Sequence, residues 1–436
     1  MKNLFLFIIL TFHSSNISAQ QWSPLGSGVN DLVSSICEYN GELIAGGYFK
    51  YAGSDSVNGV ARWDNHNWYS LGSGMGFSGH VYTSTVYNGE LYVGGIFEEA
   101  GGIYASNIAK WNGTSWSNVG TGMNGGLVFT LVVYNGELYA GGSFTIADGH
   151  AANKIAKWNG STWSSVGGGM FPIDAGNVLG LTVFNGELYA CGGFEFAGSV
   201  PASRIAKWNG TIWSAVGAGM DNTVQEMAEY NGELYACGVF TTAGGNSSPY
   251  ISKWNGSTWN IVGLGVNGRV RTLAVYNSEL FAGGDFSYAG GNPTRFIAKW
   301  DGVSWSDVGL GVDSMVASFC VFNHALYVGG FFLNAGGNNA NHIAKWLSLA
   351  GIDDTSELSE IDLFPNPTNS FLHIKNPKLN NSKLHLYNLV GDCVLFLDNL
   401  NPEEQVIDIS FLSNGIYFAK ITIKERTTIR KISLIK

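Results

Sequence analysis

The chain has 436 residues, of which 45% are apolar and 13% aromatic, so it is long enough for two or three domains with large cores. The formal net charge of −10 argues against a nucleic-acid partner, because phosphate binding depends on clustered positive charge. Sixty glycines without a collagen period, together with only nine prolines, indicate tight turns between short strands and an all-β fold.

The first 19 residues are typical of a secretory signal peptide. They contain one early lysine, an apolar run from Leu4 to Phe12 and small residues before Gln20. This run is too short to span a membrane stably, and no cysteine follows the expected cleavage site at Ala19. We therefore expect an exported protein with no lipid anchor and no membrane span.

From Gln20 onward the sequence repeats every 46 to 50 residues, as its tryptophans show. In segments such as IAKWNGTSW (residues 108 to 116), a second tryptophan follows the first by five positions. Two tryptophans lack such a partner, Trp22 and Trp346. The complete pairs are Trp63 and Trp68, Trp111 and Trp116, Trp158 and Trp163, Trp208 and Trp213, Trp254 and Trp259, and Trp300 and Trp305.

Each unit predicts four antiparallel strands. A first run such as VRTLAVY (270 to 276) leads through Asn-Gly or a variant into a second run such as ELYAGGSF (137 to 144). Asn-Gly is the preferred pair for a type I′ hairpin, because both positions need positive φ. After a loop centred on Ala-Gly-Gly, a third run and a fourth run form another hairpin, which places the two tryptophans opposite each other.

Such sheets bury both faces by stacking around an axis, which predicts a β-propeller over residues 20 to 346. The segment that begins at Gln20, QQWSPLGSG, has the features of a fourth strand without the first three. The seventh set of three strands ends at Trp346 without a fourth. We therefore expect Trp22 to pair with Trp346, closing a ring of seven blades and leaving no open sheet edge.

The repeats resemble the kelch-like class of propellers. A Gly-Gly ends the second run in six units, with Gly238-Val239 as the exception, an aromatic residue ends the third run, and a tryptophan opens the fourth. The resemblance covers residues 22 to 346 and implies the fold. It leaves the function open, because kelch-like propellers include binding proteins and enzymes.

Past an acidic linker at residues 347 to 360, residues 361 to 436 alternate apolar and polar residues, which predicts a small immunoglobulin-like β-sandwich. This tail resembles the type A C-terminal sorting domain of type IX secretion in Bacteroidetes. The resemblance implies that outer-membrane secretion machinery recognises the tail, and that the cargo is then attached to the cell surface or released. The matching positions include Phe364, Pro365, Asn366, Pro367, Gly415, Tyr417 and Lys436.

The units differ in length only between the fourth strand of one and the first strand of the next. In a propeller these connections share one face with the loops between second and third strands, and variable loops on a rigid scaffold often recognise ligands. Solvated loop polarity is the alternative for each polar residue there. The candidate ligand-binding residues around the central mouth of this face are His80, Asp174, Asn177, Asp221, Arg269, Arg271 and Asp313.

Two recurring charged positions are expected to form cross-strand ion pairs, not a catalytic site. Glutamate begins the second run in six units, and arginine or lysine precedes the third-run tryptophan in seven. The five cysteines lie in strand-like runs and are expected to be buried free thiols. The histidines lack ligand spacing, so we expect no metal and no cofactor.

These features favour a non-catalytic, exported protein that binds a protein or glycan ligand, as an adhesin does. The alternative is a secreted carbohydrate-active hydrolase or lyase with carboxylates such as Asp174, Asp221 and Asp313 at the axial mouth. Two carboxylates about 5 to 10 Å apart across a pocket would favour that chemistry. A structural surface-layer protein is a third interpretation, and it predicts self-assembly without a ligand.

Overall fold

The computed structural model describes residues 20–172, 176–348, 362–364, 368–375, 382–388, 393–398, 400, 404–423 and 426–436. The expected signal peptide, Asp174, Pro365 to Pro367 and most of the expected linker lie outside the described residues. The chain divides into two compact units, Met1–Ser348 and Leu349–Lys436.

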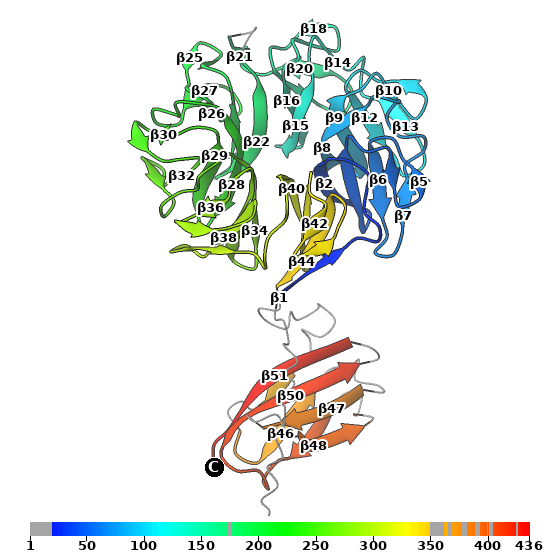
Figure 1. Cartoon of the computed structure of the whole chain (residues 1–436), viewed down its shortest axis with the longest axis vertical. Helices are drawn as coiled ribbons and strands as arrows, with labels where there is room; N and C mark the ends of the chain where they lie inside the picture. The colour runs from blue at the N-terminus through cyan, green and yellow to red at the C-terminus, as the bar shows by residue number, and fades with distance from the viewer. Residues whose placement is uncertain are drawn as a thin grey trace, which may run out of the picture. The chain divides into compact units, whose positions relative to one another are not determined.

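The first unit is a seven-bladed β-propeller (Figure 1), as predicted. Residues 20–172 and 176–348 contain seven four-stranded antiparallel sheets. The innermost strands are β2 (Val33–Tyr39), β8 (His80–Tyr87), β15 (Val128–Tyr134), β22 (Val178–Phe184), β28 (Val224–Tyr230), β34 (Val270–Tyr276) and β40 (Val316–Phe322). The second strands are β3 (Glu42–Gly47), β9 (Glu90–Ile96), β16 (Glu137–Gly142), β23 (Glu187–Gly192), β29 (Glu233–Gly238), β35 (Glu279–Gly284) and β41 (Ala325–Gly330).

The two outer strands of each blade carry the tryptophan pairs. The third strands are β6 (Val60–Trp63), β12 (Ile108–Trp111), β19 (Ile155–Trp158), β26 (Ile205–Trp208), β32 (Ile251–Trp254), β38 (Ile297–Trp300) and β44 (Ile343–Ser348). The fourth strands are β7 (Trp68–Ser70), β13 (Trp116–Asn118), β20 (Trp163–Ser165), β27 (Trp213–Ala215), β33 (Trp259–Ile261), β39 (Trp305–Asp307) and β1 (Gln20–Pro24). The Ala-Gly-Gly loops form short extra ribbons, such as β4 (Tyr51–Ala52) with β5 (Asp55–Ser56).

The N-terminal strand closes the ring, which confirms the prediction from the two unpaired tryptophans. Strand β1 pairs antiparallel with β44, and Figure 1 shows the blue N-terminal strand beside the yellow one. Trp22 lies opposite Trp346, with ring centroids 5.1 Å apart. The pairing continues to Gln20 opposite Ser348, so the strand runs two residues past the expected boundary at Trp346.

Hydrogen bonds between blades fix each sheet to its neighbour. The indole N–H of the second tryptophan in each pair donates to a backbone carbonyl just after the fourth strand of the preceding blade. The seven bonds of the described ring join Trp68 to Leu25, Trp116 to Leu71, Trp163 to Val119, Trp213 to Val166, Trp259 to Val216, Trp305 to Val262 and Trp22 to Val308. Apolar clusters also cross the boundaries, since Trp63 and Trp68 are buried in one cluster with Tyr327 and Ile343.

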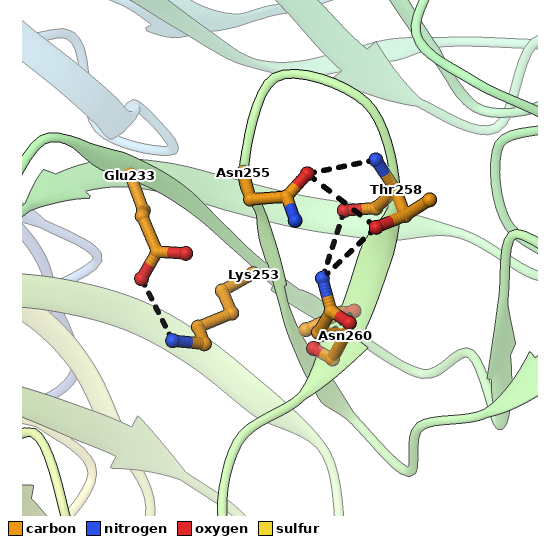
Figure 2. Close-up of polar contacts among 6 residues, drawn as sticks. Glu233, Lys253, Asn255, Thr258 and Asn260 are labelled. Carbon is orange, nitrogen blue, oxygen red and sulfur yellow. Dashed lines mark hydrogen bonds and ion pairs between the residues drawn. The ribbon is translucent and has the colours of Figure 1, made fainter.

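One face of the propeller carries the hairpins between first and second strands and between third and fourth strands, and we call it the hairpin face. It has the polar contacts expected of a repeated structural element. Lys253 Nζ lies 2.7 Å from Glu233 Oε2, and Asn255 accepts backbone hydrogen bonds inside the next turn (Figure 2). The same Glu–Lys or Glu–Arg pair occurs in six blades, and Ala325 replaces the glutamate in the blade of β40. These pairs confirm the predicted cross-strand use of the charged residues.

The second unit is a β-sandwich with a shared apolar core. One sheet has the order β45 (Asp362–Phe364), β46 (Phe371–Lys375), β49 (Glu404–Asp408). The other has the order β48 (Cys393–Asp398), β47 (Ser382–Tyr387), β50 (Gly415–Ile423), β51 (Arg426–Leu434). Residues of both sheets, including Leu372, Ile407, Leu384 and Ile421, form one buried cluster.

Several positions of the expected sorting motif have defined places in this sandwich. Phe364 is exposed and stacks on His373, Gly415 begins β50, and buried Tyr417 donates from its hydroxyl to the Ser413 carbonyl. The terminal Lys436 donates from its backbone N–H to Asn414 and from Nζ to the Ser410 carbonyl. The C-terminus is thereby tied to the sandwich.

The cysteines only partly follow the prediction of buried thiols. Cys191 and Cys237 are buried, and Cys37 and Cys320 are partly buried on innermost strands. Cys393 is exposed, because it begins β48, whose side chains are mostly half-buried or exposed.

Candidate functional site

Each innermost strand carries a β-bulge at its start. In every described blade the pairing of first and second strands shifts by one residue directly after the strand's first valine. A bulge inserts one extra residue and redirects its side chain. The inserted residues, which we call the bulge ring, are Ser34, Tyr82, Phe129, Leu179, Gln225, Arg271 and Ala317.

The bulge ring lines a cavity of about 360 Å³ at the propeller axis. A second ring of residues, one position later in each strand, lines the same cavity. This inner ring consists of Ser35, Thr83, Thr130, Gly180, Glu226, Thr272 and Ser318. The volume lies within the roughly 300–1,000 Å³ that is usual for small-molecule sites.

Aromatic side chains form one side of the cavity. The rings of His80 and Tyr82 have centroids 4.1 Å apart, and Tyr82 meets Phe129 edge-on at 5.4 Å. Tyr48, on the rim, contacts the His80 ring at 5.5 Å. These residues come from three successive blades and make a continuous aromatic surface.

His80 belongs to this surface as a neutral ring. Its Nε2 lies 2.8 Å from the Ser34 hydroxyl oxygen. Burial lowers the pKa of His80 to about 4, although the nearby Asp31 carboxylate acts in the opposite direction. At neutral pH the imidazole is therefore uncharged, and it offers packing and a hydrogen bond instead of a positive charge.

Polar side chains form the other side of the cavity, on β28 and β34. The blades follow one another around the axis in chain order, so these strands lie across the ring from β8 and β15 (Figure 1). Gln225, Glu226 and Arg271 line the cavity there. Arg269 and Arg271 both donate from Nε to Asp285 Oδ2, at 2.7 and 2.9 Å.

Glu226 replaces a threonine in a repeated contact between neighbouring blades. Thr83 and Thr130 accept hydrogen bonds from the backbone N–H groups of Leu131 and Leu181. Glu226 Oε2 accepts the equivalent bond from Leu273 at 3.1 Å, and Thr272 also hydrogen-bonds the carboxylate. Burial raises the pKa of Glu226 to about 7, because its environment disfavours the charged form.

Gly180 makes room for this carboxyl-bearing strand. A Cβ at position 180 would lie 3.3 Å from Glu226 Cα and 2.8 Å from Cys191 Sγ. The neighbouring blades therefore approach more closely than a side chain at this position would allow.

The polar residues predicted from the sequence have different positions on this face. His80 and Arg271 line the cavity. Arg269 reaches Asp285 at the rim, and Asn177 Oδ1 accepts from the Gly193 backbone N–H at 2.9 Å. Asp174 lies outside the described residues.

Asp221 and Asp313 have a structural role in the loops. Asp221 Oδ1 accepts from the backbone N–H groups of Thr241 and Thr242, and Asp313 makes the same pair of contacts, with Leu333 and Asn334, two loops further on. Asn30 and Asn267 occupy the equivalent position in other blades and accept equivalent bonds. The carboxylates of Asp221 and Asp313 therefore accept the backbone hydrogen bonds that hold a loop in each blade, as Asn30 and Asn267 do in other blades.

Four further residues that line the cavity were not predicted from the sequence, namely Tyr82, Phe129, Gln225 and Glu226. A signal was present for the first three: when the seven units are aligned on Val33 and its equivalents, the next residue differs in chemical type in nearly every unit. Glu226 lies one position further on, where the other units have serine, threonine or glycine. Apart from Arg271, the bulge-ring residues were not predicted from the variable loops, because they lie inside otherwise regular strands.

The comparison with protein families identifies the C-terminal unit. Residues 362–436 match the family model of the secretion system C-terminal sorting domain. The chain is therefore secreted or attached to the outer surface of a Bacteroidetes cell, and its tail interacts with the type IX secretion machinery. The matched residues lie outside the repeats, whose kelch-like character stays a prediction.

Solved structures with similarity to this chain include two from surface-exposed systems. PorZ, an essential surface component of the type IX secretion system of Porphyromonas gingivalis, is 14% identical with a TM-score of 0.49, over 94% of this chain and 60% of PorZ. The extracellular domain of BT3049 from B. thetaiotaomicron is 12% identical with a TM-score of 0.46, over 93% of this chain and 55% of that one. The chain thus spans less than two thirds of either structure.

No curated protein matches the sequence. Among the described residues, no helix has the length and apolar character needed to cross a membrane.

Proposed function

We propose that this chain is an exported, non-catalytic binding protein that holds a protein or glycan ligand at the axial cavity of its propeller. The observation that carries the proposal is the bulge ring. Seven structurally equivalent positions converge on one cavity, and they bear side chains of different chemistry in a repeat that is regular elsewhere. Chemical variation at equivalent positions is expected where recognition, not blade stability, determines the residue.

The arrangement of carboxylates supports binding over glycoside hydrolysis. Hydrolysis of this kind uses two carboxyl groups that face each other across the substrate, about 5 to 10 Å apart. Among the described residues that line the cavity, Glu226 is the one carboxylate. Asp285 is paired with two arginines, and Asp221 and Asp313 are used by loop contacts.

Array capture with matched variants tests the proposal. Residues 20–436 would be applied to printed arrays of glycans and of outer-membrane proteins. We expect Arg271→Ala to weaken capture about tenfold, as removal of one charge-assisted hydrogen bond does. Arg62→Ala is the control. It breaks the ion pair of Arg62 with Glu42 on the hairpin face, away from the cavity, and should leave capture unchanged.

Three results would contradict this function. Capture that is insensitive to Arg271→Ala would remove the cavity from the binding site. Cleavage of a captured glycan would favour the enzyme interpretation. Self-assembly of the purified chain without any added partner would favour a structural surface-layer role.

A further inference from the structure

We infer that the axial cavity takes one sugar ring of a glycan, with the C–H face of the ring against Tyr82 and Phe129 and its hydroxyl groups toward Gln225, Glu226 and Arg271. This inference rests on the proposed function and names the chemical class of its ligand. It follows from the shape, the aromatic side, the polar side and the charge of the cavity.

The aromatic side offers two rings, inclined at 65° to each other, to the apolar face of a sugar ring. Tyr82 and Phe129 occupy bulge positions on neighbouring blades, both line the cavity, and neither is fully buried. Their mutual edge-on contact and the His80 ring behind Tyr82 hold the aromatic groups in place. A pyranose presents several C–H groups on one face, which pack on aromatic rings because those rings carry negative charge on their faces.

The polar side offers both donors and acceptors, as a set of hydroxyl groups requires. The Gln225 amide has one acceptor oxygen and two N–H donors, and the Glu226 carboxyl group accepts hydrogen bonds. Arg271 uses Nε for Asp285, and the guanidinium group has four further N–H bonds. A hydroxyl group donates and accepts at once, so it can satisfy such a mixed surface, whereas an apolar ligand would leave these polar groups unpaired.

The charges of this side are balanced, which disfavours a strongly ionic ligand. Arg269 and Arg271 contribute two positive charges, and Asp285 and Glu226 contribute up to two negative charges. An anionic ligand would meet Glu226, and a cationic one would meet two guanidinium groups. A neutral polyhydroxylated ring places no charge beside a like charge in the cavity.

The size separates a sugar from a protein partner. A cavity of about 360 Å³ holds a group of one or two rings. A protein partner would instead bury about 800 Å² of each surface, mostly outside this cavity, and would insert at most a side chain into it. The contacts described above therefore favour the glycan.

Saturation-transfer NMR with simple glycosides tests the inference. The probes are methyl glycosides of glucose, galactose, mannose, xylose and N-acetylglucosamine, each added to residues 20–436. We expect at least one to receive saturation, strongest at C–H protons of one ring face. Tyr82→Ala and Phe129→Ala should each weaken this binding about tenfold, since one aromatic contact is worth about that much.

Two further variants distinguish a binding effect from unfolding. Tyr82→Phe keeps the aromatic face and should retain binding. Tyr69→Ala removes an aromatic ring that packs on Arg62, away from the cavity, and should also retain it. The melting temperature of each variant, measured alongside, shows whether the propeller remains folded.

The outcomes separate this inference from the proposed function. If no glycoside binds but an outer-membrane protein is captured in a Tyr82-dependent manner, the sugar assignment is wrong and the binding function holds. If neither class of probe depends on the cavity, both are wrong. If Tyr82→Ala and Tyr69→Ala weaken glycoside binding equally, the sugar lies elsewhere and the inference fails.

Discussion

Glu226 is the residue at which folding and recognition conflict most directly. Its carboxyl group accepts a backbone hydrogen bond from the next blade, yet burial raises its pKa to about 7. Between about pH 4.5 and pH 7 the folded chain keeps a proton that the unfolded chain releases. The free energy of unfolding should therefore fall as the pH rises through this window, and stay level above it.

Glu226→Gln should remove this pH dependence. The amide keeps an acceptor for Leu273 but does not ionise, so the variant should exceed the parent in stability by up to about 3 kcal/mol at pH 8 and by little at pH 4. Urea unfolding followed by tryptophan fluorescence measures this in the propeller alone, because all fourteen tryptophans lie in residues 20–348.

Glu233→Gln is the matched control for this change. It breaks a half-exposed ion pair on the hairpin face, so we expect a loss of at most about 1 kcal/mol. An equal gain from Glu226→Gln at pH 4 and pH 8 would show that the ionisation of Glu226 does not penalise the fold.

Among the elements, the hairpins between first and second strands all require positive φ at both turn positions, and different residues meet this requirement in different blades. Asn231 and Gly232 have φ of 51° and 76°, as a type I′ turn requires. In the blades of β34 and β40, Ser278 and His324 take the glycine position and still adopt φ of 61° and 57°. A side chain in this left-handed region costs about 1 kcal/mol.

Ser278→Gly should therefore stabilise the chain by about 0.5–1 kcal/mol, after the greater flexibility of glycine in the unfolded state is included. Gly232→Ser is the reverse substitution and should destabilise it by a similar amount. A Cβ at position 232 has no neighbour within 4 Å, so that loss would be a backbone effect. A lower midpoint for Ser278→Gly in urea unfolding would contradict this account.

The elements also show which parts of the molecule can be predicted from sequence. Tryptophan pairs and Asn-Gly turns have fixed spacings, and they determine strand order, register and the closing contact of Trp22 with Trp346. The bulges have no residue requirement of their own, since serine, tyrosine, phenylalanine, leucine, glutamine, arginine and alanine all occupy them. His80 and Arg271 are polar and vary between units, so they could be predicted as candidates, whereas Tyr82 and Phe129 fit the apolar pattern of a strand and have no polar group that marks them.

At the scale of the whole molecule, the ring depends on the contact between its two ends. Trp22 Nε1 donates to the Val308 carbonyl at 3.0 Å, whereas Trp346 Nε1 has no hydrogen-bond partner among the described residues. Trp22→Phe should therefore cost about 1 kcal/mol more than Trp346→Phe, because only the first leaves a buried carbonyl without its donor. Equal urea midpoints for the two variants would show that this bond contributes nothing to closure.

The closing strand also imposes an order in time on the molecule. Strand β1 is made before every other part of the ring, yet Trp22 lies 286 positions before the carbonyl that it binds. This contact cannot form until the chain has been made as far as Val308. Strand β1, the first part of the propeller to be synthesised, can therefore pair only after β44, the last part, has been made. A chain whose synthesis stopped before β44 would have six complete sheets at most and an unpaired N-terminal strand.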